Sequence, residues 1–275
     1  MSNCKVIALT NQKGGVGKTT TAVNLGVSLV QQGKKVLLID ADAQANLTMA
    51  LGYNRPDDIP ITLSNVMQNI IDDKTFDVSQ GIIHHSEGVD LLPSNIELSG
   101  FEVRLINAMS RERVLKTYVN EIKKNYDYVL IDCMPSLGMI TINALAAADS
   151  VIIPTQPHYL SAKGLELLLR SVSMVKRQIN PKLRIDGILM TMVMPRTNIS
   201  KEITATVKSA YGQKIKVFDT EIPHSIRAVE ATAEGKSIFA YDKSGKVAAA
   251  YEQLGKEVAE IGEKQRNQNR ADRIR

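Results

Sequence analysis

The amino-acid sequence predicts an α/β fold in which helices flank both faces of a doubly wound, mostly parallel sheet. Apolar segments of strand length alternate with helical patterns along the chain, which is typical of parallel sheets. Segments such as residues 34–40 are almost continuously apolar, as expected of strands covered on both faces. A glycine-rich turn, residues 11–17, joins the first strand pattern directly to the first helical pattern.

The order of the elements follows from the hydrophobic pattern. In the first helical pattern, apolar residues recur at helical spacing from Ala22 to Val30, and Gly33 is suited to end the helix. Further helices are clearest over residues 161–179 and 245–261. Residues 54–90 are the most irregular segment, with prolines and a glycine between short helices. Strands are expected at residues 4–10, 34–40, 88–94, 126–132, 149–155, 185–193 and 216–223.

Composition limits the class of protein. Of the 275 residues 44% are hydrophobic and 23% charged, which is typical of a globular protein, and no apolar run is long enough to span a membrane. Two cysteines, Cys4 and Cys133, are too few for a disulfide framework and lack metal-site spacing, which favours a cytoplasmic protein. We expect one domain over residues 1–262 and a disordered, polar and basic tail over residues 263–275.

The strongest functional motif is GGVGKTT, residues 14–20, between the first strand and the first helix. Closely spaced glycines let backbone N–H groups approach a triphosphate, and the following helix adds its positive N-terminal end. Lys18 is then expected to contact the β- and γ-phosphates, and the Thr19 hydroxyl to bind Mg²⁺. The motif therefore predicts ATP and Mg²⁺ as ligands rather than a dinucleotide.

Two of the predicted strands end in aspartate. Asp40 and Asp42 follow the second strand pattern, and Asp132 ends a later one. Ligands of open α/β sheets bind beyond the carboxyl ends of the strands, so these acids are expected near the nucleotide. Asp132 suits a metal-binding role, in part through water. Helix capping by Asp40 and Asp42 and a strand-end turn at Asp132 are the alternatives.

The loop departs from the usual G-x-x-x-x-G-K-[ST] pattern, because Gln12 stands where that pattern has glycine and Lys13 follows it. With this second lysine, KGGVGKTT resembles the deviant Walker A box of the ParA/MinD family of P-loop ATPases. The resemblance implies an ATP-dependent homodimer in which Lys13 of each subunit contacts the phosphates held by the other. It assigns nucleotide binding to Lys13, Gly14, Gly15, Val16, Gly17, Lys18, Thr19 and Thr20.

The aspartates match the same family. Residues 37–48, LLIDADAQANLT, resemble its D-x-D-P-Q-G-N motif, in which the second aspartate places the attacking water. This match gives the water-placing role to Asp42 and puts Asp40 nearer the metal. The resemblance thus implies Mg²⁺-dependent hydrolysis of ATP to ADP and phosphate. The implied catalytic residues are Lys13, Lys18 and Asp42, and the implied metal ligands are Thr19, Asp40 and Asp132.

The downstream half resembles the chromosomal and plasmid partition ATPases called ParA or Soj, in the short form without an added helix-turn-helix. In that family ATP-bound dimers bind double-stranded DNA without regard to sequence, and the matching positions here are Arg196 and Arg227. The resemblance implies slow hydrolysis that a ParB-like centromere-binding partner stimulates, and a cytoplasmic, nucleoid-associated protein. Lys201, Lys208, Lys214 and Lys216 are candidates to extend the DNA-binding patch.

Four positions depart from the family patterns. Ala43 and Ala45 replace the usual proline and glycine of the switch motif, Met134 replaces a proline, and His224 replaces an arginine. We expect these changes to affect the hydrolysis rate and the affinity for DNA. The alternatives are a MinD-like membrane-associated regulator, which the polar tail disfavours, and a metabolic ATPase of the same superfamily.

Overall fold

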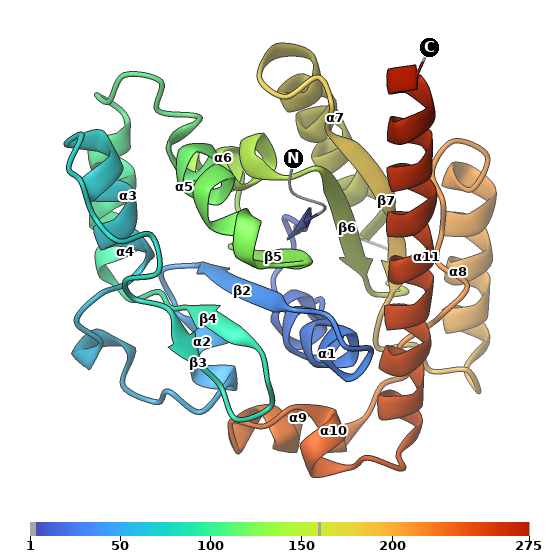
Figure 1. Ribbon diagram of the computed structural model, residues 1–275. Helices are drawn as coiled ribbons and strands as arrows, with labels where there is room; N and C mark the ends of the chain where they lie inside the picture. The colour runs from blue at the N-terminus through green and yellow to red at the C-terminus, as the bar shows by residue number, and fades with distance from the viewer. Residues whose placement is uncertain (1–3, 159–160, 275) are drawn as a thin grey trace.

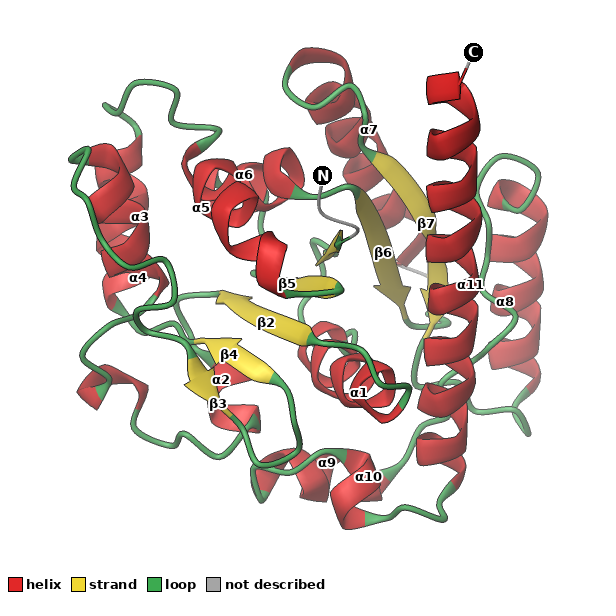
Figure 2. Cartoon of the chain, viewed as in Figure 1, coloured by secondary structure: helices red, strands yellow, loops and turns green. Residues whose placement is uncertain are grey.

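The computed structural model describes residues 4–158 and 161–274. Among these residues, seven strands form one sheet in the order β3-β4-β2-β5-β1-β6-β7 (Figures 1 and 2). Every neighbouring pair is parallel except β3 with β4. The predicted doubly wound, mostly parallel sheet is therefore confirmed. The strands are β1 (Lys5–Leu9), β2 (Val36–Ala41), β3 (Ile83–His84), β4 (Asp90–Leu92), β5 (Tyr128–Cys133), β6 (Ser150–Thr155) and β7 (Arg184–Met190).

Helices cover both faces of the sheet (Figure 1). One face carries α1 (Lys18–Gln31), α2 (Asn46–Ala50), α9 (Ile226–Ala233), α10 (Ile238–Tyr241) and α11 (Lys246–Ile274). The other carries α3 (Leu63–Ile71), α4 (Glu97–Leu105), α5 (Val114–Ile122), α6 (Met139–Ala147), α7 (Ser161–Gln178) and α8 (Asn198–Tyr211). The described residues also contain two short 3₁₀ helices, η1 (Pro56–Asp58) and η2 (Lys123–Asn125). In the part of the chain that the structure describes, none of the helices combines the length and hydrophobicity of a membrane span.

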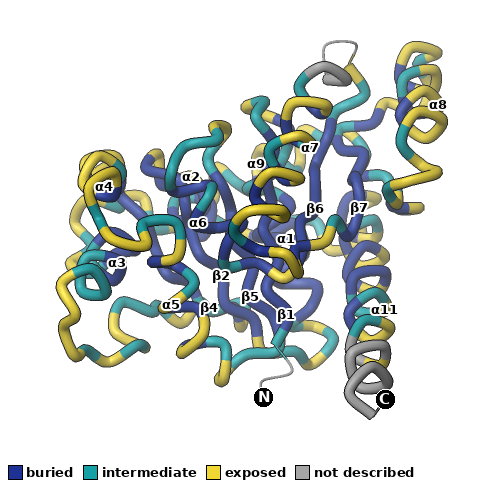
Figure 3. Tube along the Cα trace, turned by 90° about the horizontal axis from the view of Figure 1, so that it is seen from above, coloured by how far each residue is buried: buried dark blue, intermediate teal, exposed yellow. Residues whose placement is uncertain are grey.

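The strands alternate between two hydrophobic cores. In β1, Val6 and Ala8 belong to the core beneath α3 to α8, whereas Ile7 and Leu9 belong to the core beneath α1 and α11. All four side chains are buried because both faces are covered, and Figure 3 shows the buried strands at the centre of the molecule. The near-continuous apolar runs of the sequence have this physical origin.

Residues 216–223 differ from the predicted strand. They lie along β7 but make only isolated parallel bridges, Ile188 with Val217 and Val193 with Pro223. The cause is Glu257 of α11, whose carboxylate accepts hydrogen bonds from the backbone N–H groups of Asp219 and Thr220 at 3.2 and 2.9 Å. Phe218 and Ile222 donate to the carbonyls of Ile188 and Met190, so the Thr220 N–H between them is the donor that the ladder loses to Glu257.

The tail expected to be disordered is also different, because α11 continues as a helix through Ile274. Residue 275 lies outside the described residues. Residues 263–274 are rich in Glu, Lys, Gln and Arg, which favour helix once a preceding helix has nucleated it. Gln265 adds a tertiary contact, since its Nε2 donates to Asp186 Oδ1 at 2.9 Å. Asp186 in turn forms a buried ion pair with Lys5 at 2.6 Å.

Candidate active site

The glycine-rich loop lies between β1 and α1, in the strand-loop-helix context that the motif requires. Gly15 and Gly17 have φ values of 69° and 81°, a backbone conformation that side chains with a Cβ rarely adopt. The helix begins at Lys18, directly after Gly17. The N-terminal end of α1 therefore points its unpaired N–H groups and its positive dipole end at the loop.

The two lysines of the loop differ in environment. Lys18 is buried, and its Nζ donates to the carbonyl oxygen of Lys13 at 3.4 Å. Burial lowers the pKa of Lys18, while the nearby Asp132 carboxyl opposes that shift. Lys13 is half-buried, and its backbone N–H donates to Asn11 Oδ1 at 3.0 Å. The structure thus fixes the backbone at Lys13 and places a buried cation behind the loop.

Thr19 and Asp132 come together at the same end of the sheet. The Thr19 hydroxyl donates to Asp132 Oδ2 at 2.6 Å, whereas Asp132 Oδ1 is buried without a hydrogen-bond partner within the described residues. Burial raises the pKa of Asp132 to about 7, although the Thr19 bond and the Lys18 charge act in the opposite direction. An unpaired buried carboxylate oxygen is costly unless a donor or a cation completes its environment.

These groups fit a hydrated Mg²⁺. Mg²⁺ takes oxygen ligands and usually keeps several waters beside one or two carboxylates and the substrate phosphates. Thr19 and Asp132 offer a hydroxyl and a carboxylate with one free oxygen. Over residues 4–158 and 161–274 no group of three or more His, Cys, Asp or Glu side chains could hold a metal ion. The remaining ligands at Thr19 and Asp132 would therefore be water and phosphate.

Asp40 is hydrogen-bonded to the turn and helix that follow β2. It pairs in register with Asp132 across β2 and β5, but its Oδ2 accepts hydrogen bonds from the Thr48 N–H and hydroxyl at 2.8 and 2.7 Å. Its Oδ1 accepts the N–H of Asp42 at 3.2 Å. Burial, and next the charge of Asp132, raise the pKa of Asp40 to about 8. The two bonds to Thr48 connect α2 to the end of β2.

Asp42 lies in the turn between β2 and α2. It is almost fully buried, and its Oδ1 accepts the N–H of Gln44 at 3.0 Å. Ala45, which follows in the turn, has a φ of 52°, in the left-handed region that favours glycine. This is the position at which the matching motif has glycine, so the alanine keeps the turn's conformation at a cost in strain.

Two residues outside the motif hold the loop, and sequence reasoning did not single them out. Gln156 Nε2 donates to the carbonyl oxygen of Gly15 at 2.7 Å, and Thr191 Oγ1 donates to that of Val16 at 2.8 Å. Gln156 directly follows β6 and Thr191 directly follows β7. The available signal was positional, since polar residues at the carboxyl ends of parallel strands meet at one edge of the sheet.

Comparisons with known proteins show the family of this chain. A family model described as an AAA domain matches residues 4–185. The sporulation initiation inhibitor protein Soj of Bacillus subtilis is 44% identical over 259 residues, covering 94% of this chain and 99% of Soj. The chromosome partitioning protein ParA of Myxococcus xanthus is 39% identical, covering 92% of this chain and 87% of ParA. The chain belongs to the ParA/MinD family of P-loop ATPases.

A solved structure with a different function is also similar. Cobyrinic acid a,c-diamide synthase from Mycobacterium smegmatis, with a bound ATP analogue and magnesium, superposes with a TM-score of 0.81 at 35% identity. The alignment covers 92% of this chain and 93% of that one. ParA/MinD-type chains and this synthase therefore share one fold around a nucleotide site.

The two arginines matched to ParA-type DNA contacts lie on neighbouring segments. Arg196 precedes α8 and Arg227 lies in α9, and both are exposed. The segments that carry them run together, because Val193 bridges to Pro223 and the His224 N–H donates to the Val193 carbonyl at 3.0 Å. The fold thus brings the two arginine segments of this ParA/MinD chain together at the end of β7.

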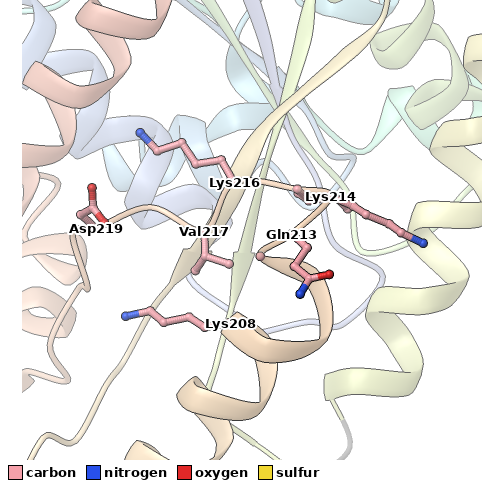
Figure 4. A pocket seen from close by; sticks show the side chains of 8 residues that line it. Lys208, Gln213, Lys214, Lys216, Val217 and Asp219 are labelled. Carbon is pink, nitrogen blue, oxygen red and sulfur yellow. The ribbon is translucent and has the colours of Figure 1, made fainter.

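The lysines considered as an extension of the ParA-type patch are less available. A pocket at the end of α8 contains three of them (Figure 4). Lys208 pairs with Glu221 at 2.9 Å and Lys216 with Glu257 at 3.5 Å. In Figure 4 the Lys214 side chain extends to the opposite side from the side chains of Lys208 and Lys216. Two of the three charges are therefore already partly neutralised. The pocket is lined by Lys208, Gly212, Gln213, Lys214, Ile215, Lys216, Val217 and Asp219.

Proposed function

We propose that this protein is a DNA partition ATPase that binds Mg²⁺ and ATP, closes into a homodimer, and holds DNA in that state. One observation carries the proposal: the deviant loop with Lys13 and Lys18 sits beside the Thr19–Asp132 pair. The 44% identity to Soj along almost the whole of that protein supports it. Triphosphate binding at the loop would use N–H groups, a helix N-terminus and two lysines together.

Electrostatic stabilisation would carry the hydrolysis of ATP. Lys18 would contact the β- and γ-phosphates from within the subunit, and Lys13 would reach the phosphates held by the second subunit. Asp42, in the turn after β2, would orient the attacking water. Thr19 and Asp132 would hold Mg²⁺, which supplies positive charge to the phosphate oxygens. Asp40 would act through Thr48 by fixing α2, and in this way would support the position of Asp42.

DNA binding would follow from dimer closure. Arg196 and Arg227 are exposed and carry fixed charges that suit phosphate oxygens at any sequence. A closed dimer would present both arginines twice, which raises the number of phosphate contacts. A ParB-like partner would stimulate hydrolysis, open the dimer and release it from the nucleoid.

A metabolic role is the second candidate, because a cobyrinic acid diamide synthase shares the fold at 35% identity. The higher identity to Soj favours partition. The two functions differ in what ATP does for the protein. A partition ATPase is expected to gain affinity for DNA when it binds ATP, whereas a diamide synthase would use ATP in the synthesis of a small molecule.

A gel shift on random-sequence duplex DNA tests the proposal. We expect retarded DNA with Mg²⁺ and a non-hydrolysable ATP analogue, and little retardation with Mg²⁺ and ADP. Replacing both Arg196 and Arg227 by alanine should abolish the shift, while Lys35→Ala, which removes an exposed charge just before β2, serves as the matched control. Equal DNA binding with both nucleotides, or none with either, would contradict the proposal.

A further inference from the structure

The carbonyl groups of the glycine-rich loop are held from outside by side chains. Lys18 Nζ donates to the Lys13 carbonyl at 3.4 Å, Gln156 Nε2 to the Gly15 carbonyl at 2.7 Å, and Thr191 Oγ1 to the Val16 carbonyl at 2.8 Å. Two of these three donors come from the ends of β6 and β7, 141 and 175 residues away in sequence. The loop therefore depends on the neighbouring strands for its conformation.

The orientation of these carbonyls determines that of the amides. All peptide bonds in the described residues are trans, so each C=O points away from the N–H of the following residue. With the Gly15 and Val16 oxygens turned toward Gln156 and Thr191, the Val16 and Gly17 N–H groups point the opposite way. Within the described residues, the N–H groups of residues 14–17 donate to no other protein group. These donors are thus left for a ligand.

We propose that Gln156 and Thr191 are positioning residues for the triphosphate, which preset the loop amides before the nucleotide arrives. The inference rests on the proposed nucleotide site and adds two residues to it. Donors that are fixed in advance cost no reorganisation when the anion binds.

Met192 extends the contact toward the arginine segment. Gln156 Nε2 also donates to Met192 Sδ at 2.8 Å, and Met192 has a φ of 52°. This left-handed turn directly follows Thr191, and Arg196 lies four residues beyond Met192. One side-chain amide thus joins the phosphate loop to the segment that leads to α8.

Isothermal titration with Mg²⁺ and ADP tests the inference. Thr191→Val keeps the shape of the side chain but removes the hydroxyl, and we expect its dissociation constant for ADP to rise about fivefold, the effect of one missing hydrogen bond. Gln156→Leu should give a rise of similar size, about fivefold, and its half-exposed position keeps the core intact. Thr191→Ser retains the hydroxyl and should bind within about twofold of the wild type.

The controls separate positioning from packing. Thermal melting without nucleotide checks that each variant is folded before titration. Equal weakening by Thr191→Ser and Thr191→Val would overturn the inference, because the hydroxyl would then be irrelevant. Unchanged ADP affinity in both Thr191→Val and Gln156→Leu would also overturn it and leave the proposed function standing. Failure of the wild-type protein to bind ADP would overturn the proposed function and this inference with it.

Discussion

Replacing Thr48 by valine removes one hydroxyl from the junction of β2 and α2 and keeps the shape of the side chain. That hydroxyl donates to Asp40 Oδ2 at 2.7 Å and accepts the Ser94 N–H at 3.1 Å, in a fully buried site. Losing the first bond costs about 1 kcal/mol, and a buried N–H without an acceptor costs about 1–3 kcal/mol. We expect the free energy of unfolding to fall by about 3 kcal/mol.

Guanidinium and thermal denaturation of the nucleotide-free protein measure this effect. A loss of about 3 kcal/mol corresponds to a Tm lower by about 6–12 °C in a chain of this size. Thr48→Ser keeps the hydroxyl, loses one buried methyl group, and should cost about 1 kcal/mol. Thr48→Val with wild-type stability, or Thr48→Ser as unstable as Thr48→Val, would refute the hydrogen-bond account of this junction.

Three further predictions concern the reaction and the DNA. Asp42→Ala should bind ATP normally but lose most of its hydrolysis, because water is no longer oriented; unchanged turnover in a phosphate-release assay would reject that role. Arg196→Ala or Arg227→Ala should weaken DNA binding equally for all sequences and reduce the slope of log affinity against log salt by about 1 for each phosphate that the variant no longer binds. A salt slope equal to that of the wild type would exclude a role in phosphate binding. EDTA should abolish hydrolysis, and excess Mg²⁺ should restore it, because Thr19 and Asp132 provide too few ligands to retain the ion; activity that persists in EDTA would contradict this.

Much of the fold could be predicted from the sequence, because strands buried on both faces leave continuous apolar runs. The strand-loop-helix context of residues 14–20 was predictable for a similar reason, since glycines and a helix start are local signals. The prediction failed where a distant side chain decides the local structure. Glu257 accepts hydrogen bonds from the backbone of residues 219 and 220 and interrupts the strand predicted over residues 216–223. No local pattern in that segment reveals this contact.

The site was predictable in part. The loop motif contains Thr19 and the strand pattern placed Asp132 near the nucleotide, and the structure joins the two by one hydrogen bond. Asp40 matched the same pattern, but its bonds to Thr48 depend on the path of α2, which the motif does not encode. Gln156 was missed because its partner is a backbone carbonyl 141 residues away in sequence. Every residue type has a backbone carbonyl, so the sequence does not indicate which residue accepts such a hydrogen bond.

Dimer formation by way of Lys13 is the central claim, and light scattering after size exclusion tests it most directly. With Mg²⁺ and a non-hydrolysable ATP analogue, the 30.2-kDa chain should elute at about twice its mass, and with ADP as a monomer. Lys13→Ala should stay monomeric with either nucleotide while still binding the analogue, whereas the control Lys35→Ala should dimerise as the wild type does. A Lys13→Ala protein that dimerises as tightly as the wild type would contradict the account.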